Sequence, residues 1–169
     1  LIGAYAGEYG QSNYSIAIGD SAGNDGLGYR SVAIGQDAAY EGSNSYTVSL
    51  GYGAGRATPG QGAIAIGDSA GYGASQYSVA IGYGAGWADG SPLGNSQVAI
   101  GALAAAGGGQ DYSIVLNASG DYFDAIASGL FIRPVRYIAT QDATDDGLMF
   151  YNQTTGEVRY SYLLDGGAF

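Results

Sequence analysis

The sequence predicts an all-β protein, a parallel β-solenoid built from coils of sixteen residues. The first observation is a repeated aliphatic-glycine motif, whose successive spacings are 16, 16, 16, 16, 15, 19 and 16 residues. A period this short excludes two-helix repeats, which need about thirty residues or more. The second is composition, since 32 of the 169 residues are glycine. The motif stands at Ile2-Gly3, Ile18-Gly19, Ile34-Gly35, Leu50-Gly51, Ile66-Gly67, Ile81-Gly82, Ile100-Gly101 and, modified, at Leu116-Asn117.

Each coil is expected to contribute one short strand, which ends just before the glycine. Large and small side chains alternate there, as in Ser31-Val32-Ala33-Ile34, and alternate side chains point to opposite faces of a strand. We expect the large side chains to fill the coil interior. The small ones are expected to pack against neighbouring subunits, and they are Ala17, Ala33, Ser49, Ala65, Ala80 and Ala99.

Such packing of a second face predicts a homotrimer, with chains side by side or intertwined, because three-fold assembly is a common solution for fibres. The alternative is that alanine simply fits a narrow coil. The residues expected in the trimer packing or the core are Ile18, Ala33, Ile34, Ala65, Ile66, Ala80, Ile81 and Ile100.

Glycine-rich turns follow the strands, and glycine supplies the positive φ that tight corners require. Two turns match the G-x-S-x-G pattern, at Ser21 and Ser69, but the chain has no His to act as a base. Corner geometry is therefore the better interpretation, and no catalytic residue is expected.

Tyrosine precedes the strand in several coils, which predicts a ladder of rings stacked from coil to coil. Its members are Tyr14, Tyr46, Tyr77 and Tyr112, with Tyr29 one residue earlier in its coil.

The 19-residue interval predicts an outward loop that holds the only Trp. A ring face beside hydroxyl and carboxylate groups suits a sugar. The receptor-binding candidates are Trp87, Asp89, Ser91 and Asn95, and the alternative is that Trp87 packs on its own loop or on a neighbouring subunit.

Composition excludes several functions. Without Cys or His the chain can form no disulfide, no ordinary zinc site and no Ser-His-Asp triad. A net charge of −10 opposes binding to nucleic acid or anionic lipid. The sequence contains no run of about 18 apolar residues, so membrane insertion is not expected. We expect no cofactor and no metal, and a cell-surface glycan or protein receptor as the partner.

After Leu116 the repeat breaks down, which predicts a boundary between residues 1–119 and a β-rich tip or neck at 120–169. The stretch from Gly147 to Ser161 reads as a β-hairpin with Asn152 to Gly156 in its turn. Ahead of it, Asp142, Asp145 and Asp146 lack regular ligand spacing, so a solvated turn is favoured over a calcium site.

The repeated Ser-Val-Ala-Ile-Gly with its Gly/Ala turn resembles the YadA-like head of trimeric autotransporter adhesins, over residues 1–119. That resemblance implies a left-handed parallel β-roll, three chains and adhesion, although the coil is longer here and Tyr replaces the family's usual Asn before the strand. The later segment from Gly129 to Arg136, with Leu148–Asn152 and Thr155–Val158, is similar to the part of phage tail fibres that precedes a self-cleaving intramolecular chaperone.

Together the two resemblances imply a receptor-binding segment of a trimeric viral tail fibre, located on the virion. An end at Phe169 would suit a fibre tip left after such a cleavage. The alternative is that the end is arbitrary. The alternative is the head of a bacterial trimeric adhesin on the cell surface. Less favoured are an ice-binding solenoid, because the tyrosine ladder is irregular, and a glycan depolymerase using carboxylates such as Asp121 and Asp124.

Overall fold

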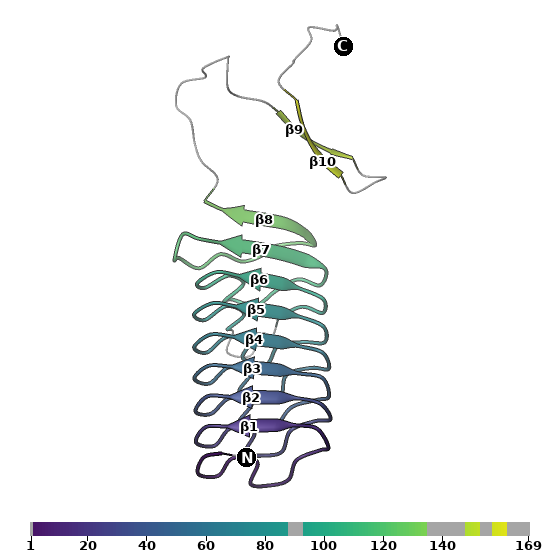
Figure 1. Cartoon of the computed structure of the whole chain (residues 1–169). Helices are drawn as coiled ribbons and strands as arrows, with labels where there is room; N and C mark the ends of the chain where they lie inside the picture. The colour runs from purple at the N-terminus through teal and green to yellow at the C-terminus, as the bar shows by residue number, and fades with distance from the viewer. Residues whose placement is uncertain (1, 88–92, 135–147, 153–156, 162–169) are drawn as a thin grey trace, which may run out of the picture. The chain divides into compact units, whose positions relative to one another are not determined.

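The computed structural model describes residues 2–87, 93–134, 148–152 and 157–161. It divides into two units, 1–134 and 135–169, and within the described ranges there is no helix. The first unit is a solenoid whose eight strands form one parallel sheet in chain order (Figure 1). The predicted fold class is therefore confirmed. The strands are β1 (Ile16–Ile18), β2 (Val32–Ile34), β3 (Val48–Leu50), β4 (Ile64–Ile66), β5 (Val79–Ile81), β6 (Val98–Ile100), β7 (Ser113–Asn117) and β8 (Gly129–Arg133).

Neighbouring strands pair so that equivalent positions of the repeat form straight rows along the stack. Val48 of β3, for example, lies between Val32 of β2 and Ile64 of β4. The glycine after each strand forms its own row. At Gly67 φ is +128°, and a Cβ there would lie 2.6 Å from the carbonyl oxygen of Gly82 in the next coil. The glycine repeats because backbone stacks directly on backbone at this corner, as the turn pattern predicts.

The coil interior is filled by the small side chains, which corrects the expectation that the large ones would fill it. The alanines in the middle of β1, β2 and β5 are 0% exposed, whereas Ile16 on β1 is 48% exposed. The opposite wall of the coil is also lined by buried alanines. These are Ala22, Ala38, Ala54, Ala70, Ala85 and Ala104.

The physical reason is the thinness of the coil. A Cβ added at Gly71 would lie 2.8 Å from the Cβ of Ala65 and 3.4 Å from that of Ala80, so one wall already contacts the other. An interior this narrow leaves little volume for leucine or isoleucine at the strand positions, and the buried leucines, Leu27 and Leu93, lie outside the strands. Of the residues expected in the packing or core, Ala33, Ala65 and Ala80 are inside the coil, whereas the large ones lie on the outer face. Those are Ile18, Ile34, Ile66, Ile81 and Ile100.

From β2 to β7 the residue before the first aliphatic position is buried, and it is serine in three of the six strands. The hydroxyl of Ser78 donates to the carbonyl oxygen of Ser75 at 2.7 Å, and that of Ser113 donates to Gln110 at 2.8 Å. Ser31 donates to the carbonyl oxygen of Asn44 at 2.9 Å. A small hydroxyl at this position therefore satisfies a backbone carbonyl at the edge of the narrow interior. Before β6 the buried Gln97 takes its place and accepts the backbone N–H of Gly94 at 3.0 Å.

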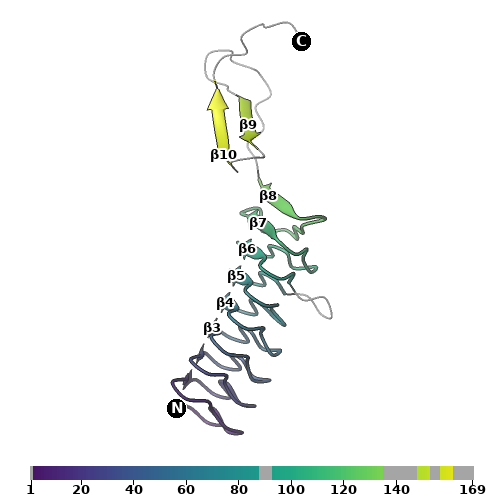
Figure 2. The same ribbon diagram turned by 90° about the vertical axis from the view of Figure 1, so that its right-hand side faces the viewer.

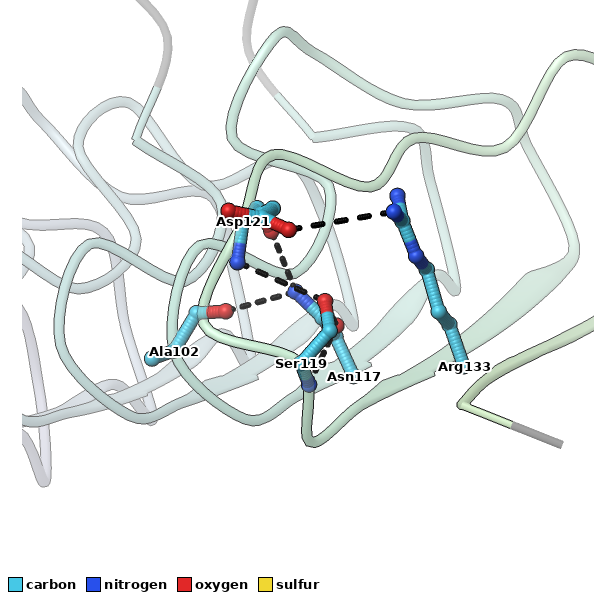
Figure 3. A network of polar contacts seen from close by, with 5 residues as sticks. All are labelled: Ala102, Asn117, Ser119, Asp121 and Arg133. Atoms are coloured by element: carbon cyan, nitrogen blue, oxygen red, sulfur yellow. Dashed lines mark hydrogen bonds and ion pairs between the residues drawn. The ribbon is translucent and has the colours of Figure 1, made fainter. Parts of the chain in front are cut away.

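The solenoid extends beyond the boundary expected near residue 120, because β8 pairs with β7 in parallel as a further strand of the same sheet. At the end of β7, Asn117 replaces the corner glycine (Figure 3). Its Nδ2 donates to the carbonyl oxygens of Ala102 and Asp121, both at 2.7 Å, and its Oδ1 accepts from the Ser119 hydroxyl at 2.7 Å. A carboxylate oxygen of Asp121 lies 3.7 Å from the guanidinium of Arg133 on β8. The amide of Asn117 thus links the last regular coil to the loop that leads toward β8.

In the second unit, β9 (Leu148–Asn152) and β10 (Glu157–Ser161) form an antiparallel pair, with Leu148 opposite Ser161 and Asn152 opposite Glu157. These strands confirm the predicted hairpin. Of the expected turn residues, Asn152 instead ends β9, and residues 153–156 lie outside the described residues, as do Asp142, Asp145 and Asp146.

Candidate functional site

The outer face of the parallel sheet is covered by aliphatic side chains. Figure 2 shows β3 to β8 stacked along one side of the coils. Because the strands are in register, the first and third residues of each strand form two continuous rows, and every member is Ile, Val or Leu. We call these two rows the aliphatic face. It comprises Ile16, Val32, Val48, Ile64, Val79, Val98 and Ile114 in one row, and Ile2, Ile18, Ile34, Leu50, Ile66, Ile81, Ile100 and Leu116 in the other.

None of these side chains is needed to close the coil. Ile16, Ile34, Ile100 and Ile114 are exposed, and the remaining members from β2 to β7 are only half-buried by their neighbours in the rows. Leu130 and Ile132 of β8 extend the rows and are also exposed. A solvated sheet face ordinarily carries polar residues, and a continuous apolar strip of this kind marks an interaction surface. The aliphatic face is therefore suited to association with another apolar surface.

One border of the aliphatic face is the corner before each strand, and we call it the pre-strand edge. Here the predicted tyrosine ladder is confirmed for three rings: the centroid of Tyr29 lies 5.7 Å from that of Tyr14 and 5.8 Å from that of Tyr46, in edge-to-face contact. The Arg30 guanidinium lies 4.9 Å from the centroid of Tyr29. The edge comprises Tyr14, Arg30, Tyr46, Gly62, Tyr77, Ser96 and Tyr112, all with positive φ.

The residues that carry these rings adopt an unfavourable backbone conformation. An L-residue in the left-handed region is disfavoured by about 1–2 kcal/mol, and Gly62 shows that the same corner accepts glycine. The ring of Tyr77 lies across Gly62 in the preceding coil, where an added Cβ would come within 2.7 Å of its Cδ1. Tyr14 nevertheless leaves 76% of its surface exposed. Contacts within one chain therefore bury only part of the surface of these rings.

The other border follows each strand and its corner glycine, and we call it the post-strand edge. Tyr52 and Tyr83 are both exposed there, and Asp20 and Asp68 stand at the same position of other coils. The residues of this edge are Ala4, Asp20, Gln36, Tyr52, Asp68, Tyr83 and Ala102.

The serines of the two G-x-S-x-G turns lie beside the aspartates of this edge. The hydroxyl of Ser69 donates to Asp68 Oδ1 at 2.7 Å, and that of Ser21 donates to Asp20 Oδ1 at 3.2 Å. Each hydroxyl therefore makes a local turn contact with the preceding carboxylate.

The four receptor-binding candidates are not assembled into one described site. Trp87 is 38% exposed, but Asp89 and Ser91 lie outside the described residues. The backbone N–H of Asn95 donates to Asp111 Oδ1 at 2.7 Å, which ties Asn95 to the following coil. Leu93, at the end of the inserted loop, is buried in the coil interior, so the loop rejoins the solenoid through an apolar anchor.

The two carboxylates considered for glycan cleavage each have a structural partner. Asp121 pairs with Arg133, and Asp124 Oδ1 accepts the backbone N–H of Gly107 at 2.9 Å. Among the described residues, no group of three or more acidic side chains is placed to hold a metal ion. The same part of the chain contains no helix long and apolar enough to cross a membrane.

No known family, curated protein or solved structure matches this chain. Sequence reasoning found both rows of the aliphatic face but placed them inside the coil. The signal that would have placed them outside is the second row of small residues, such as Ala54 and Ala70, which lines the opposite wall and leaves an interior of alanine width.

Proposed function

We propose that this chain is a structural and receptor-binding segment of a trimeric fibre, and that the fibre is a viral tail fibre. The aliphatic face carries the proposal. It runs from Ile2 to Ile132 without a polar interruption, and a copy of the same face is the partner that matches it in length and repeat spacing. Three sheets that face a common axis enclose their aliphatic rows in one core.

The energetics favour assembly. Complete burial of an Ile, Val or Leu side chain contributes about 1.5–3 kcal/mol, and most members of the face are only half-buried in the single chain. Each coil of each chain therefore has two side chains whose burial is completed only by a partner. The coil interior, filled by alanine and serine, contributes little by comparison, so assembly is expected to supply a large share of the stability of the rod.

The attachment role rests on two further features. Trp87 is exposed beside the insertion in an otherwise regular rod, and an exposed ring of this kind suits a glycan or protein receptor. The sequence after the rod, including the β9 and β10 hairpin, resembles the segment that precedes a chaperone domain in phage tail fibres. Both features support a fibre that attaches to a cell surface.

The assembly is tested by measuring the mass of the intact chain and of its Leu50→Glu variant in solution. Light scattering is expected to give three times the chain mass of 17.0 kDa for the intact protein. Leu50 lies in the middle of the aliphatic face, between Ile34 and Ile66, so a glutamate there would be buried unpaired in a trimer at a cost of several kcal/mol. The variant is expected to be monomeric with an unchanged β-sheet circular dichroism spectrum.

The matched control is Gln110→Glu, which adds the same charge at an exposed position away from the aliphatic face. This variant should remain trimeric. A monomeric intact chain would contradict the proposed assembly, and so would a Leu50→Glu variant that keeps the full trimeric mass.

A further inference from the structure

The two edges of the aliphatic face carry like residues at the ends of some strands, most clearly β3 and β5, although the edges are remote within one chain. Tyr46 and Tyr52 stand at the two ends of β3, and Tyr77 and Tyr83 stand at the two ends of β5. The members of each pair are six positions apart, which is at most about 20 Å of extended chain. No contact within one chain accounts for the match, and the rings at both ends are exposed.

The match extends to charge and to size. Arg30 precedes β2, and Gln36 and Asp37 follow it, so a cation and an acid flank the same strand. Ser96 and Ala102, both small, flank β6. The ends differ at β1 (Tyr14 and Asp20), β4 (Gly62 and Asp68) and β7 (Tyr112 and Ala118). In this acidic chain, Arg30 lies on the pre-strand edge, while the post-strand edge and its corners carry Asp20, Asp37 and Asp68.

Rotational symmetry brings the unlike edges together. When identical sheets face an axis that runs along the stack, the pre-strand edge of each copy meets the post-strand edge of the next copy. Rotation without translation keeps each strand at its own height, and the strands run across the stack (Figure 1). The two ends of one strand, taken from adjacent copies, therefore meet at the same level.

We propose that the pre-strand edge of one copy packs against the post-strand edge of its neighbour, so that Tyr46 meets Tyr52 and Tyr77 meets Tyr83 across each subunit boundary. Arg30, held over the ring of Tyr29, faces Asp37 of the neighbour at the level of β2. This inference rests on the proposed trimer and goes beyond it, because it fixes a parallel arrangement and its axial register. Tyrosine is enriched in interfaces, where a ring contributes a large apolar surface and a hydroxyl.

The test uses the absence of Cys from the natural chain. A variant carrying both Tyr46→Cys and Tyr52→Cys is treated with a short bismaleimide, because two tyrosine-sized gaps separate the backbones further than a disulfide allows. The expected product is a covalent trimer on a denaturing gel. Each single-cysteine variant is expected to remain monomeric on that gel, since like edges do not meet.

The matched control is the variant with Glu41→Cys and Tyr52→Cys, which places one thiol on an exposed residue outside both edges. It should give no covalent trimer. Trimeric mass in light scattering without cross-linking of the Tyr46/Tyr52 pair would overturn the edge contact and leave the trimer itself standing. A cross-linked dimer from either single variant would show antiparallel packing and would also overturn it. A monomeric mass would instead contradict the assembly on which the inference rests.

A charge exchange tests the same contact at another level. Arg30→Asp and Asp37→Arg are each expected to lower the concentration of denaturant at which the trimer dissociates, and the double variant is expected to recover most of the loss. Mixing the two single variants should also produce hybrid trimers. Additive losses in the double variant would argue against the Arg30–Asp37 contact.

Discussion

At the residue scale, backbone conformation limits which side chains a coil accepts. Several positions of each coil have positive φ, and glycine occupies many of them, but Ser96 and Leu103 adopt φ of 53° and 54°. Where such a residue lacks a compensating contact, the left-handed conformation is simply unfavourable. Where its side chain contacts a neighbour, as in the tyrosine ladder, the contact offsets part of that cost.

Replacement of Ser96 by glycine is expected to stabilise the protein. Relief of the left-handed conformation contributes about 1–2 kcal/mol, and the greater freedom of glycine in the unfolded chain removes about 0.4–1 kcal/mol, which leaves a net gain of about 0.5–1 kcal/mol. Denaturant unfolding of Ser96→Gly measures this gain. Gln110→Gly, at an exposed residue without positive φ, should lose about 0.5–1 kcal/mol, and equal effects of the two changes would refute the explanation.

At the element scale, the unit is the coil, since each strand pairs only with its counterparts in the coils before and after it. The rows of glycine, alanine and aliphatic residues are continuous only while every coil supplies the same positions. Stability is then close to a sum over coils and their contacts.

Removal of one whole coil is therefore expected to leave a folded, shorter rod. Deletion of residues 48–63 joins Thr47 to Ile64, so that β2 would pair with β4 and Gly35 would stack on Gly67 in the original register. Thermal unfolding followed by circular dichroism should remain cooperative, with a modest decrease in stability. Deletion of residues 56–63 breaks the rows and should abolish the transition; a similar profile for both deletions would contradict this view.

The repeat made much of the fold predictable, because strict spacing fixes the strands, their parallel order and the corner glycines. The hairpin strands were found from alternating residues around a turn. What the sequence left open was which face of the strand is inside. Alternation at Val32, Ala33 and Ile34 defines two faces but not the distance to the opposite wall, and that distance decides which residues fit. The end of the solenoid was also missed, because Gly129–Arg133 continues the sheet without the repeat motif.

At the scale of the whole molecule, the proposed function depends on the proposed trimer rather than on a cluster of side chains within one chain. The receptor candidates could be predicted only in part. The single Trp beside the insertion can be identified from the sequence, whereas the hydrogen bond from the Asn95 backbone to Asp111 depends on how successive coils align. Three copies of Trp87 in one trimer would bind a repeated surface receptor with avidity well above that of one site.

If three copies of Trp87 bind together, variants of Trp87 and of the trimer interface should bind arrays of cell-surface glycans, or receptor-bearing cells, to different degrees. Trp87→Ala is expected to remain trimeric and to lose at least about tenfold in binding, while Trp87→Phe keeps a ring and most of the affinity. Leu50→Glu, with its single site, should bind about a hundredfold more weakly than the trimer. Full binding by a trimeric Trp87→Ala variant would remove Trp87 from the receptor surface.

The outward position of the aliphatic rows also bears on how the protein is made. Because the interior of each coil is filled by side chains of the same chain, mostly alanine and serine, a newly synthesised chain can complete its solenoid before it meets another copy, and it then carries the whole strip in solvent. Such a species adheres to other apolar surfaces, so productive encounter competes with aggregation. For the proposed trimer, yield then depends on the rate at which copies find one another, and synthesis of several chains close together would favour assembly over aggregation.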